Sequence, residues 1–150
     1  MKIFDVVFLD MQMPEMDGAE VGRIIRSESG FNDTRLVMMT SMSARGDASF
    51  FASLGFDAYF PKPMTSDDLY SALAVVVQGG DLLAGAQPLV TRHYLKELAA
   101  EKGVNTSSDL SRIIEEKEKS ILLVEDNRIN QELALGLLQE FGLQCDIANN

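Results

Sequence analysis

Residues Val6–Leu9 form a short, wholly apolar run that ends on the carboxylate of Asp10. A run of this length, rich in β-branched and aromatic side chains, predicts a central parallel strand buried by helices on both faces. Pro14 and the pair Asp17-Gly18 then break the chain before the next helix. The chain is therefore predicted to be an α/β protein. Asp10 is predicted to lie at the carboxyl end of a strand, where open α/β sheets bind their ligands.

The same strand-helix pattern occurs three times within residues 1–78. After the first strand, apolar spacing predicts a helix over 19–27, and further strands are predicted at 35–40 and 58–60. Helices are predicted around 50–54 and from a cap at Thr65 or Ser66 onward.

A fresh α/β pattern begins at Ile121–Val124, an apolar strand that ends on two adjacent acids. Asn127 can cap a following helix, and a final strand is predicted over 143–148, with Cys145 and Ile147 pointing inward. The apolar residues of that helix are predicted to share one face: Ile129, Leu133, Leu137, Leu138 and Phe141.

Residues 79–120 differ from both flanking parts. They hold two charged amphipathic segments, Thr91–Lys102 and Ser108–Lys119, and are predicted to be a partly helical linker. His93 lies in the first segment and is expected to be a surface residue. The predicted division is thus 1–78, a linker over 79–120, and 121–150.

Composition narrows the function classes. The formal net charge is −10, with 13 basic residues against 23 acidic ones, which argues against nucleic acid as a direct partner. Cys145 is the only cysteine, which excludes an internal disulfide and fits a reducing compartment. No apolar run approaches a membrane span, so we expect a cytoplasmic segment without direct membrane contact, whose parent protein could still be membrane-anchored.

Polar groups follow several of the predicted strands. Asp10, Thr40 and the pair Glu125-Asp126 each end a strand, and Lys62 lies just beyond another. Parallel strands bring these ends to one edge of the sheet, and clustered carboxylates there favour a hard cation such as Mg²⁺. Such a site suits phosphoryl chemistry, with Asp10 as an acyl-phosphate nucleophile. The Thr40 hydroxyl and the Lys62 ammonium would neutralise charge on the phosphoryl oxygens.

Four motifs together resemble the receiver domains of two-component signalling: Phe8–Gly18, Met39–Ser41, Tyr59–Pro63 and Leu123–Asn127. The resemblance implies a flavodoxin-like, doubly wound, parallel five-stranded sheet. It also implies that Asp10 accepts phosphate from a histidine kinase or a histidine phosphotransfer domain.

The resemblance further assigns roles within the site. Thr40 and Lys62 would hold the phosphoryl group, and Tyr59 would change rotamer when Thr40 moves. The Lys62-Pro63 peptide bond is expected to be cis. The implied ligands of Mg²⁺ are Glu125, Asp126, Asp10 and the backbone carbonyl of Gln12.

The motif order departs from that family. Receivers begin with the acid pair and end with the Lys-Pro motif, whereas here the acid pair comes last and the second helix is missing. Leu89–His93 resembles linkers that join two receivers in hybrid sensor histidine kinases. We therefore expect the back of one receiver (1–78) followed by the front of the next (121–150).

This order leaves two arrangements open. Residues 4–10 would otherwise form an unpaired apolar edge, and pairing with 121–125 would cover it, either within one chain as a permutant or between two swapped chains. A linker of this length permits both, and a homodimer is the favoured expectation.

Two other functions remain open. A phosphatase of the haloacid dehalogenase type also uses a strand-end aspartate and Mg²⁺, but it needs a second aspartate where this chain has Gln12. A phosphorylation-independent docking module is the other alternative. We expect no independent enzyme activity from this segment, although its parent could be a sensor histidine kinase.

Overall fold

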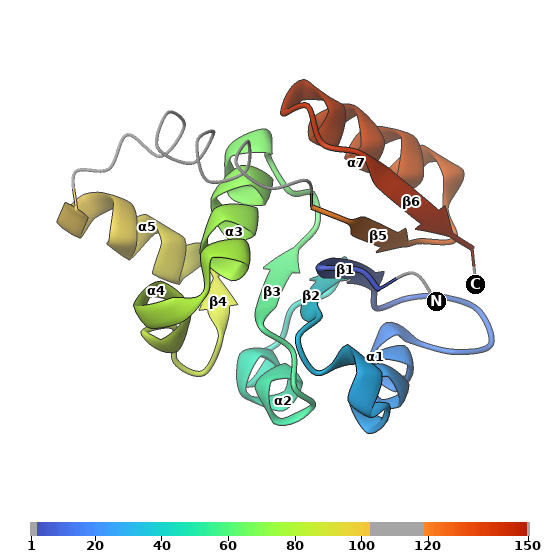
Figure 1. The fold of residues 1–150 in the computed structure, drawn as a ribbon, viewed down its shortest axis with the longest axis horizontal. Coiled ribbons are helices and arrows are strands. Elements are labelled where there is room, and N and C mark those ends of the chain that lie inside the picture. The colour runs from blue at the N-terminus through green and yellow to red at the C-terminus, as the bar shows by residue number, and fades with distance from the viewer. Residues whose placement is uncertain (1–2, 103–118, 150) are drawn as a thin grey trace.

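A computed structural model describes residues 3–102 and 119–149 of the chain. Its centre is a single six-stranded parallel sheet, in the order β4-β3-β2-β1-β5-β6 (Figure 1). The strands are β1 (Val6–Asp10), β2 (Arg35–Thr40), β3 (Ala58–Pro61), β4 (Val90–Thr91), β5 (Ile121–Val124) and β6 (Cys145–Ala148).

Strand β1 joins the two parts of the chain that the sequence separates. On one side it pairs with β2, from Val6↔Arg35 to Asp10↔Met39. On the other side it pairs with β5, from Val6↔Ile121 to Leu9↔Val124. The apolar run is therefore covered on both edges by strands of the same chain.

The amino ends of β1 and β5 are also joined by side chains. The carboxylate of Asp5 accepts hydrogen bonds from the Ser120 amide at 2.9 Å and from the Lys119 ammonium at 3.0 Å. The main-chain amide of Asp5 donates to the Ser120 carbonyl at 2.9 Å. These contacts fix the register of β5 against β1.

Helices cover both faces of the sheet (Figure 1). One face packs against α1 (Gly18–Ser27) and α2 (Asp47–Ser53), with the 3-10 turn η1 (Ser29–Phe31) between them in sequence. The other face packs against α3 (Ser66–Gln78) and α7 (Arg128–Glu140). Alternate residues of β1 divide between the two cores, Val7 and Leu9 facing one and Val6 and Phe8 the other.

Polar side chains fix where three of these helices begin. Asp17 accepts from the Glu20 amide at the start of α1, and Asn127 accepts from the Ile129 amide at the start of α7. Thr65 and Asp68 form a reciprocal capping box at the start of α3. The sequence predicted the caps of α3 and α7, and the helices begin as expected.

The described part of the segment after α3 holds two helices and a short strand. It forms α4 (Gly80–Ala84), the short strand β4 and α5 (Arg92–Lys102). Strand β4 pairs with β3, which makes the sheet six-stranded rather than five-stranded as predicted. Leu89 and Val90 are buried there, because they extend the apolar edge of β3. The predicted segment Ser108–Lys119 lies outside the described residues, except for Lys119.

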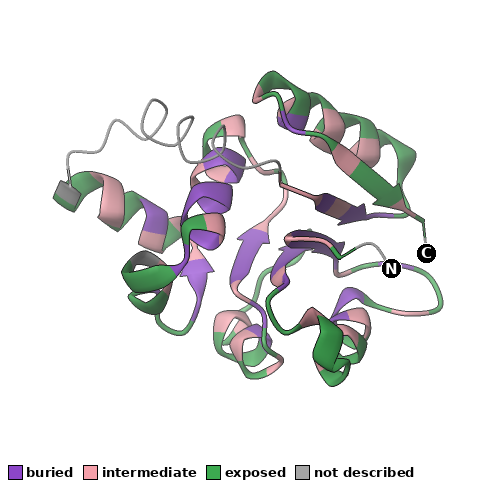
Figure 2. Cartoon of the chain, in the orientation of Figure 1, coloured by how far each residue is buried: buried purple, intermediate pink, exposed green. Residues whose placement is uncertain are grey.

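The predicted apolar face of α7 is only partly buried. Leu138 is buried, whereas Ile129 and Leu133 are 69% and 63% exposed. Figure 2 shows α7 mostly exposed or intermediate, in contrast to the buried central strands. Leu133 borders an open apolar hollow between α3 and α7 rather than a closed core, which leaves its side chain largely exposed.

The inward prediction for β6 holds for Cys145 and is wrong for Ile147. Cys145 packs against the core, and its burial raises the pKa of the thiol to about 11. Ile147 is 39% exposed, because β6 is the outer strand of the sheet and has only β5 beside it. No helix follows β6 within the described residues.

A charged network closes the amino ends of β2 and β3. The carboxylate of Asp57 lies 3.0 Å from Arg26 Nη2 and 3.2 Å from Arg35 Nη1. It also accepts a hydrogen bond from the Leu36 amide at 2.9 Å. One acid is therefore neutralised by two guanidinium groups and tied to the backbone of β2.

None of the helices in the described part of the chain is long and apolar enough to cross a bilayer.

Candidate functional site

Three strands deliver charged side chains to one edge of the sheet. Asp10 is the last residue of β1, Glu125 follows β5, and Lys62 follows β3. The Lys62 ammonium lies 2.9 Å from Asp10 Oδ1 and 2.6 Å from Glu125 Oε2. The site predicted from strand ends is thus assembled from both parts of the chain, with Lys62 between two carboxylates.

A third acid completes the cluster. Carboxylate oxygens of Asp10, Glu125 and Asp126 lie within 4.8 Å of one another. Asp10 and Glu125 are buried, whereas Asp126 is exposed. Three converging carboxylates against one ammonium leave an excess of negative charge, and oxygen donors of this kind fit a hard divalent cation.

Glu125 is held by several donors. Its Oε1 accepts from the Asn127 amide at 3.1 Å and from Asn130 Nδ2 at 3.2 Å, while Oε2 faces Lys62. Burial by itself would raise the pKa of the Glu125 carboxyl, but these hydrogen bonds and the Lys62 charge bring it below its usual value. Glu125 is therefore kept ionised.

Asp10 has fewer donors. Its Oδ1 accepts a 3.3 Å hydrogen bond from the Gln12 amide in addition to the contact with Lys62. Burial raises the pKa of the Asp10 carboxyl, and the neighbouring Glu125 charge adds to the rise, which Lys62 only partly offsets. Asp10 thus accepts fewer hydrogen bonds than Glu125 does.

Thr40 is the last residue of β2 and Tyr59 lies in the neighbouring strand β3, and both are buried. The Thr40 hydroxyl donates to the Met42 carbonyl at 2.7 Å and accepts from the Met42 amide at 3.2 Å. The Tyr59 hydroxyl donates to Asp47 at 3.0 Å, and its ring stacks on Phe51 at a centroid distance of 5.3 Å. Burial and then the Asp47 carboxylate raise the pKa of Tyr59 to about 12.

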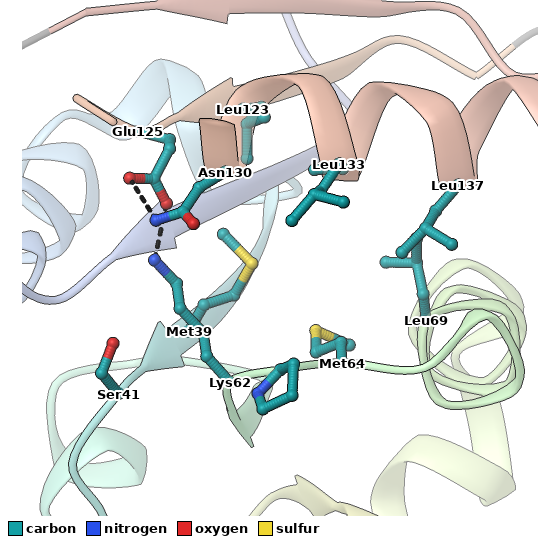
Figure 3. A pocket seen from close by; sticks show the side chains of 12 residues that line it. Met39, Ser41, Lys62, Met64, Leu69, Leu123, Glu125, Asn130, Leu133 and Leu137 are labelled. Atoms are coloured by element: carbon teal, nitrogen blue, oxygen red, sulfur yellow. Dashed lines mark hydrogen bonds and ion pairs between the residues drawn. The ribbon is translucent and has the colours of Figure 1, made fainter. Parts of the chain in front are cut away.

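An apolar hollow of about 370 Å³ opens beside the cluster, between α3 and α7. Figure 3 shows Lys62, Glu125 and Asn130 at one end of it, with Leu133 and Leu137 on α7. Leu69 of α3 lines it opposite Leu137. One wall of the charged site is therefore continuous with an open apolar surface.

Several contributing residues were not predicted from the sequence. Asn130 and Gln131 bind the side chain and the backbone of Glu125, and Asp47 binds Tyr59. Asn130 follows the capping Asn127 by three residues, so a polar residue in the first turn of α7 was a usable sign. Asp47 had no such sign, because the fold alone brings it to Tyr59.

The Lys62-Pro63 peptide bond is cis, as the resemblance implied, and so is Gln87-Pro88.

The chain matches a protein-family model over residues 1–74, and that model describes the response regulator receiver domain. This segment is similar to the receiver domains of two-component signalling. The match covers Asp10 and Thr40, which end β1 and β2, and Lys62, which follows β3. The acid pair Glu125-Asp126 lies beyond the match. The pairing of β5 with β1 is what brings that pair to the matched segment.

Curated relatives carry corresponding names. Over 62 residues the chain is 37% identical to Stress response regulator protein 1 of Scheffersomyces stipitis, covering 41% of this chain and 22% of that protein. Over 76 residues it is 37% identical to Hybrid signal transduction histidine kinase A of Dictyostelium discoideum, covering 49% of this chain and 4% of that protein. Probable histidine kinase 5 of Oryza sativa is 35% identical over 91 residues, covering 47% and 8%. The chain therefore spans less than a quarter of the length of each of these relatives.

One solved structure is similar in sequence over a limited part. It is the signal receiver domain of a signal transduction histidine kinase from Syntrophus aciditrophicus, 27% identical, with a TM-score of 0.39. The alignment covers 57% of this chain and 61% of that one. The family match and the curated relatives favour a receiver over the phosphatase and docking alternatives.

Proposed function

We propose that this chain is a phospho-accepting receiver module of a His-Asp phosphorelay, in which Asp10 takes phosphate from a phosphohistidine. The observation that carries the proposal is the position of Asp10. It ends the central strand, its carboxylate lies 2.9 Å from the Lys62 ammonium, and it converges with Glu125 and Asp126. The donor would be a histidine kinase or a histidine phosphotransfer domain, as in the phosphorelays of hybrid kinases.

In the proposed reaction an oxygen of the Asp10 carboxylate attacks the phosphorus of phosphohistidine. A P–O bond forms as the P–N bond breaks, and the imidazole nitrogen leaves with the bonding electron pair and takes up a proton. The Lys62 ammonium, already beside Asp10, then pairs with a phosphoryl oxygen. The Thr40 hydroxyl would donate to a second oxygen after giving up its bond to Met42.

The donor set at the site fits Mg²⁺. Asp10, Glu125 and Asp126 would hold it, with the backbone carbonyl of Gln12 as a further ligand. When bound, Mg²⁺ supplies positive charge that stabilises the phosphoryl oxygens. With the cation present, the carboxylates of Asp10 and Glu125 would face both Mg²⁺ and Lys62. The Asn127 amide and the Asn130 side chain would keep the Glu125 carboxylate in place.

Phosphorylation would act on the rest of the molecule through Thr40 and Tyr59. Movement of the Thr40 hydroxyl toward the phosphoryl group frees the Met42 loop, and this loop leads to Asp47, the partner of Tyr59. The populations of two arrangements around α2 and β3 would shift, with no change of fold.

The chain arrangement belongs to the same proposal. Residues 1–78 would be the back of one receiver and residues 121–150 the front of the following one, from a tandem-receiver hybrid histidine kinase, with 79–120 between them. A homodimer remains the proposed assembly in solution, with the site closed either within one chain or between two. The open apolar hollow beside α7 and the exposed Leu133 supply apolar surface for such an association.

Phosphorylation is tested with ³²P-labelled acetyl phosphate and Mg²⁺. Wild type should be labelled by an acid-stable, alkali-labile bond, and Asp10→Asn should not be. Asp33→Asn, which removes an exposed acid at the amino end of β2, opposite to the end that carries the charged site, is the matched control and should be labelled like wild type. Absence of label on wild type would contradict the proposal, and binding of unphosphorylated partners would then favour a docking module. Steady release of phosphate from ordinary phosphomonoesters would instead favour a phosphatase.

Chain exchange is tested by complementation. Asp10→Ala and the double variant Glu125→Ala/Asp126→Ala would be unfolded, refolded together and assayed for labelling beside wild type. A labelled mixture of two separately unlabelled variants means that the site forms between chains. Labelled wild type with an unlabelled mixture means that each chain closes its own site.

A further inference from the structure

The segment Leu89–His93 lies outside the residues that match the receiver family model, yet it is joined to the site. Strand β4 extends the sheet through Ala58↔Val90 and Tyr59↔Thr91, and Arg92 begins α5 directly afterwards. The side chain of Arg92 is thereby carried over the loop that follows β3, the loop that holds Lys62.

Arg92 contacts the main chain on both sides of Lys62. Its Nη2 lies 3.1 Å from the carbonyl oxygen of Pro63 and 3.5 Å from that of Pro61. The same nitrogen lies 2.9 Å from Asp68 Oδ2, which holds the guanidinium in place from α3. One cationic group thus bridges the Lys62 loop and the first turn of α3.

The loop that holds Lys62 has few main-chain donors of its own. Pro61 and Pro63 have no N–H, so neither can anchor the loop by donating a main-chain hydrogen bond. The Lys62 amide does donate, to the Thr40 carbonyl at 2.7 Å. The carbonyls on either side of it face Arg92, so the Lys62 backbone is held by β2 from one side and by Arg92 from the other.

The position of the Lys62 ammonium depends on that backbone. The ammonium ends a flexible four-carbon stem and must stay within hydrogen-bond reach of Asp10 and Glu125, at 2.9 and 2.6 Å. Small displacements of a charge-stabilising group reduce phosphoryl transfer steeply. We propose that Arg92 is a positioning residue that holds the Lys62 loop, so that the segment after the receiver sets the efficiency of phosphorylation at Asp10.

This inference rests on the proposed function, and its test separates the two. Arg92→Met keeps the aliphatic stem and removes the donors, whereas Arg92→Lys keeps a cationic donor that can reach the same carbonyls. Lys96→Met removes one positive charge from an exposed position of the same helix and is the matched control. Acetyl phosphate labelling rates and Mg²⁺ affinity from amide chemical shifts would be measured for each full-length variant, after circular dichroism confirms folding.

We expect Arg92→Met to lower the labelling rate about tenfold. Arg92→Lys should restore most of it, Lys96→Met should match wild type, and the Mg²⁺ affinity of all three should stay within about twofold of wild type. An unchanged rate in Arg92→Met would overturn the proposal. So would equal loss in Arg92→Lys, or a parallel loss of Mg²⁺ affinity, since both indicate general distortion of the domain.

A second readout covers failure of the parent proposal. If wild type is not labelled at all, the phosphorelay role fails, but the position of Lys62 can still be measured by the nitrogen and proton shifts of its ammonium group. In wild type these shifts should differ from those of exposed lysines, and in Arg92→Met they should move toward them. Identical Lys62 shifts in the two proteins would show that Arg92 does not position it.

Discussion

The two ends of the parallel strands carry charge in opposite ways. At the amino ends, Asp57 is surrounded by Arg26 and Arg35 and by a backbone amide, so its charge is matched and its oxygens are occupied. At the carboxyl ends, three acids lie close together, and the ammonium of Lys62 pairs with two of them, Asp10 and Glu125. The first arrangement stabilises the fold, whereas the second leaves attraction for a further cation. Charge alone therefore does not mark a functional site; the balance of charge does.

The strongest test of this contrast is Asp57→Ala. The change should lower the free energy of unfolding by about 3 kcal/mol, because it leaves two partly buried guanidinium groups and an amide without their shared acceptor. Urea denaturation followed by circular dichroism measures the loss, with Asp33→Asn as the control. The labelling rate of the folded fraction should not change. A loss below about 1 kcal/mol would mean that the amino-end network is not a structural clamp.

The carboxyl-end acids should respond to Mg²⁺ instead. Saturating Mg²⁺ should stabilise wild type, by about 2.7 kcal/mol at a concentration one hundred times the dissociation constant, since only the folded state gathers the ligands. Glu125→Gln/Asp126→Asn should lose this increment, and Asp57→Ala should keep it. Thermal unfolding with and without EDTA provides the measurement. Equal stabilisation of all three proteins would indicate a site elsewhere.

Asp10→Asn should change the free energy of unfolding less than Asp57→Ala does, and it should raise it rather than lower it. The pKa of the Asp10 carboxyl is raised, so its charged form costs stability at neutral pH. This cost disappears as the pH falls through the raised pKa toward the ordinary pKa of an aspartate. Without Mg²⁺, the neutral amide should therefore raise the free energy of unfolding by roughly 0.5 kcal/mol. Urea titration in EDTA at pH 7 tests this, and destabilisation by Asp10→Asn would show that the Lys62 contact outweighs burial.

Asp47 lies near the carboxyl ends but resembles Asp57, because it accepts from the Tyr59 hydroxyl and from the Ala44 amide. The Tyr59 pKa of about 12 exceeds the ordinary value of about 10, so its contribution to stability is complete below pH 10 and is lost as pH rises through 12. Asp47→Asn should lower the Tyr59 pKa toward 10 with little change in stability at pH 7. Tyrosine ring carbon shifts followed against pH would show it, and an unmoved pKa would assign the shift to burial alone.

The sequence predicted what local patterns and strand ends control. Short apolar runs predicted five of the strands, and polar residues directly after them predicted the meeting of Asp10, Lys62 and Glu125. These predictions succeeded because strand direction in a parallel sheet fixes which end a residue occupies.

The rest depends on packing between distant elements. Thr91–Lys102 reads as a charged helix, which α5 confirms, but nothing local shows that β4 joins the sheet before it. The apolar spacing of α7 predicts a buried face, yet Leu133 borders the hollow instead. The pairing of Arg26 with Asp57 spans 31 residues and has no local signal.

The two outer strands differ in how readily they could recruit another strand. An unpaired strand edge offers a row of main-chain donors and acceptors to any passing chain. The β4 edge is only the two residues Val90–Thr91, whereas β6 extends over the four residues Cys145–Ala148 and exposes Ile147. Within the described residues, self-association at high protein concentration would therefore begin along β6. Ile147→Lys is therefore the substitution that should reduce this self-association.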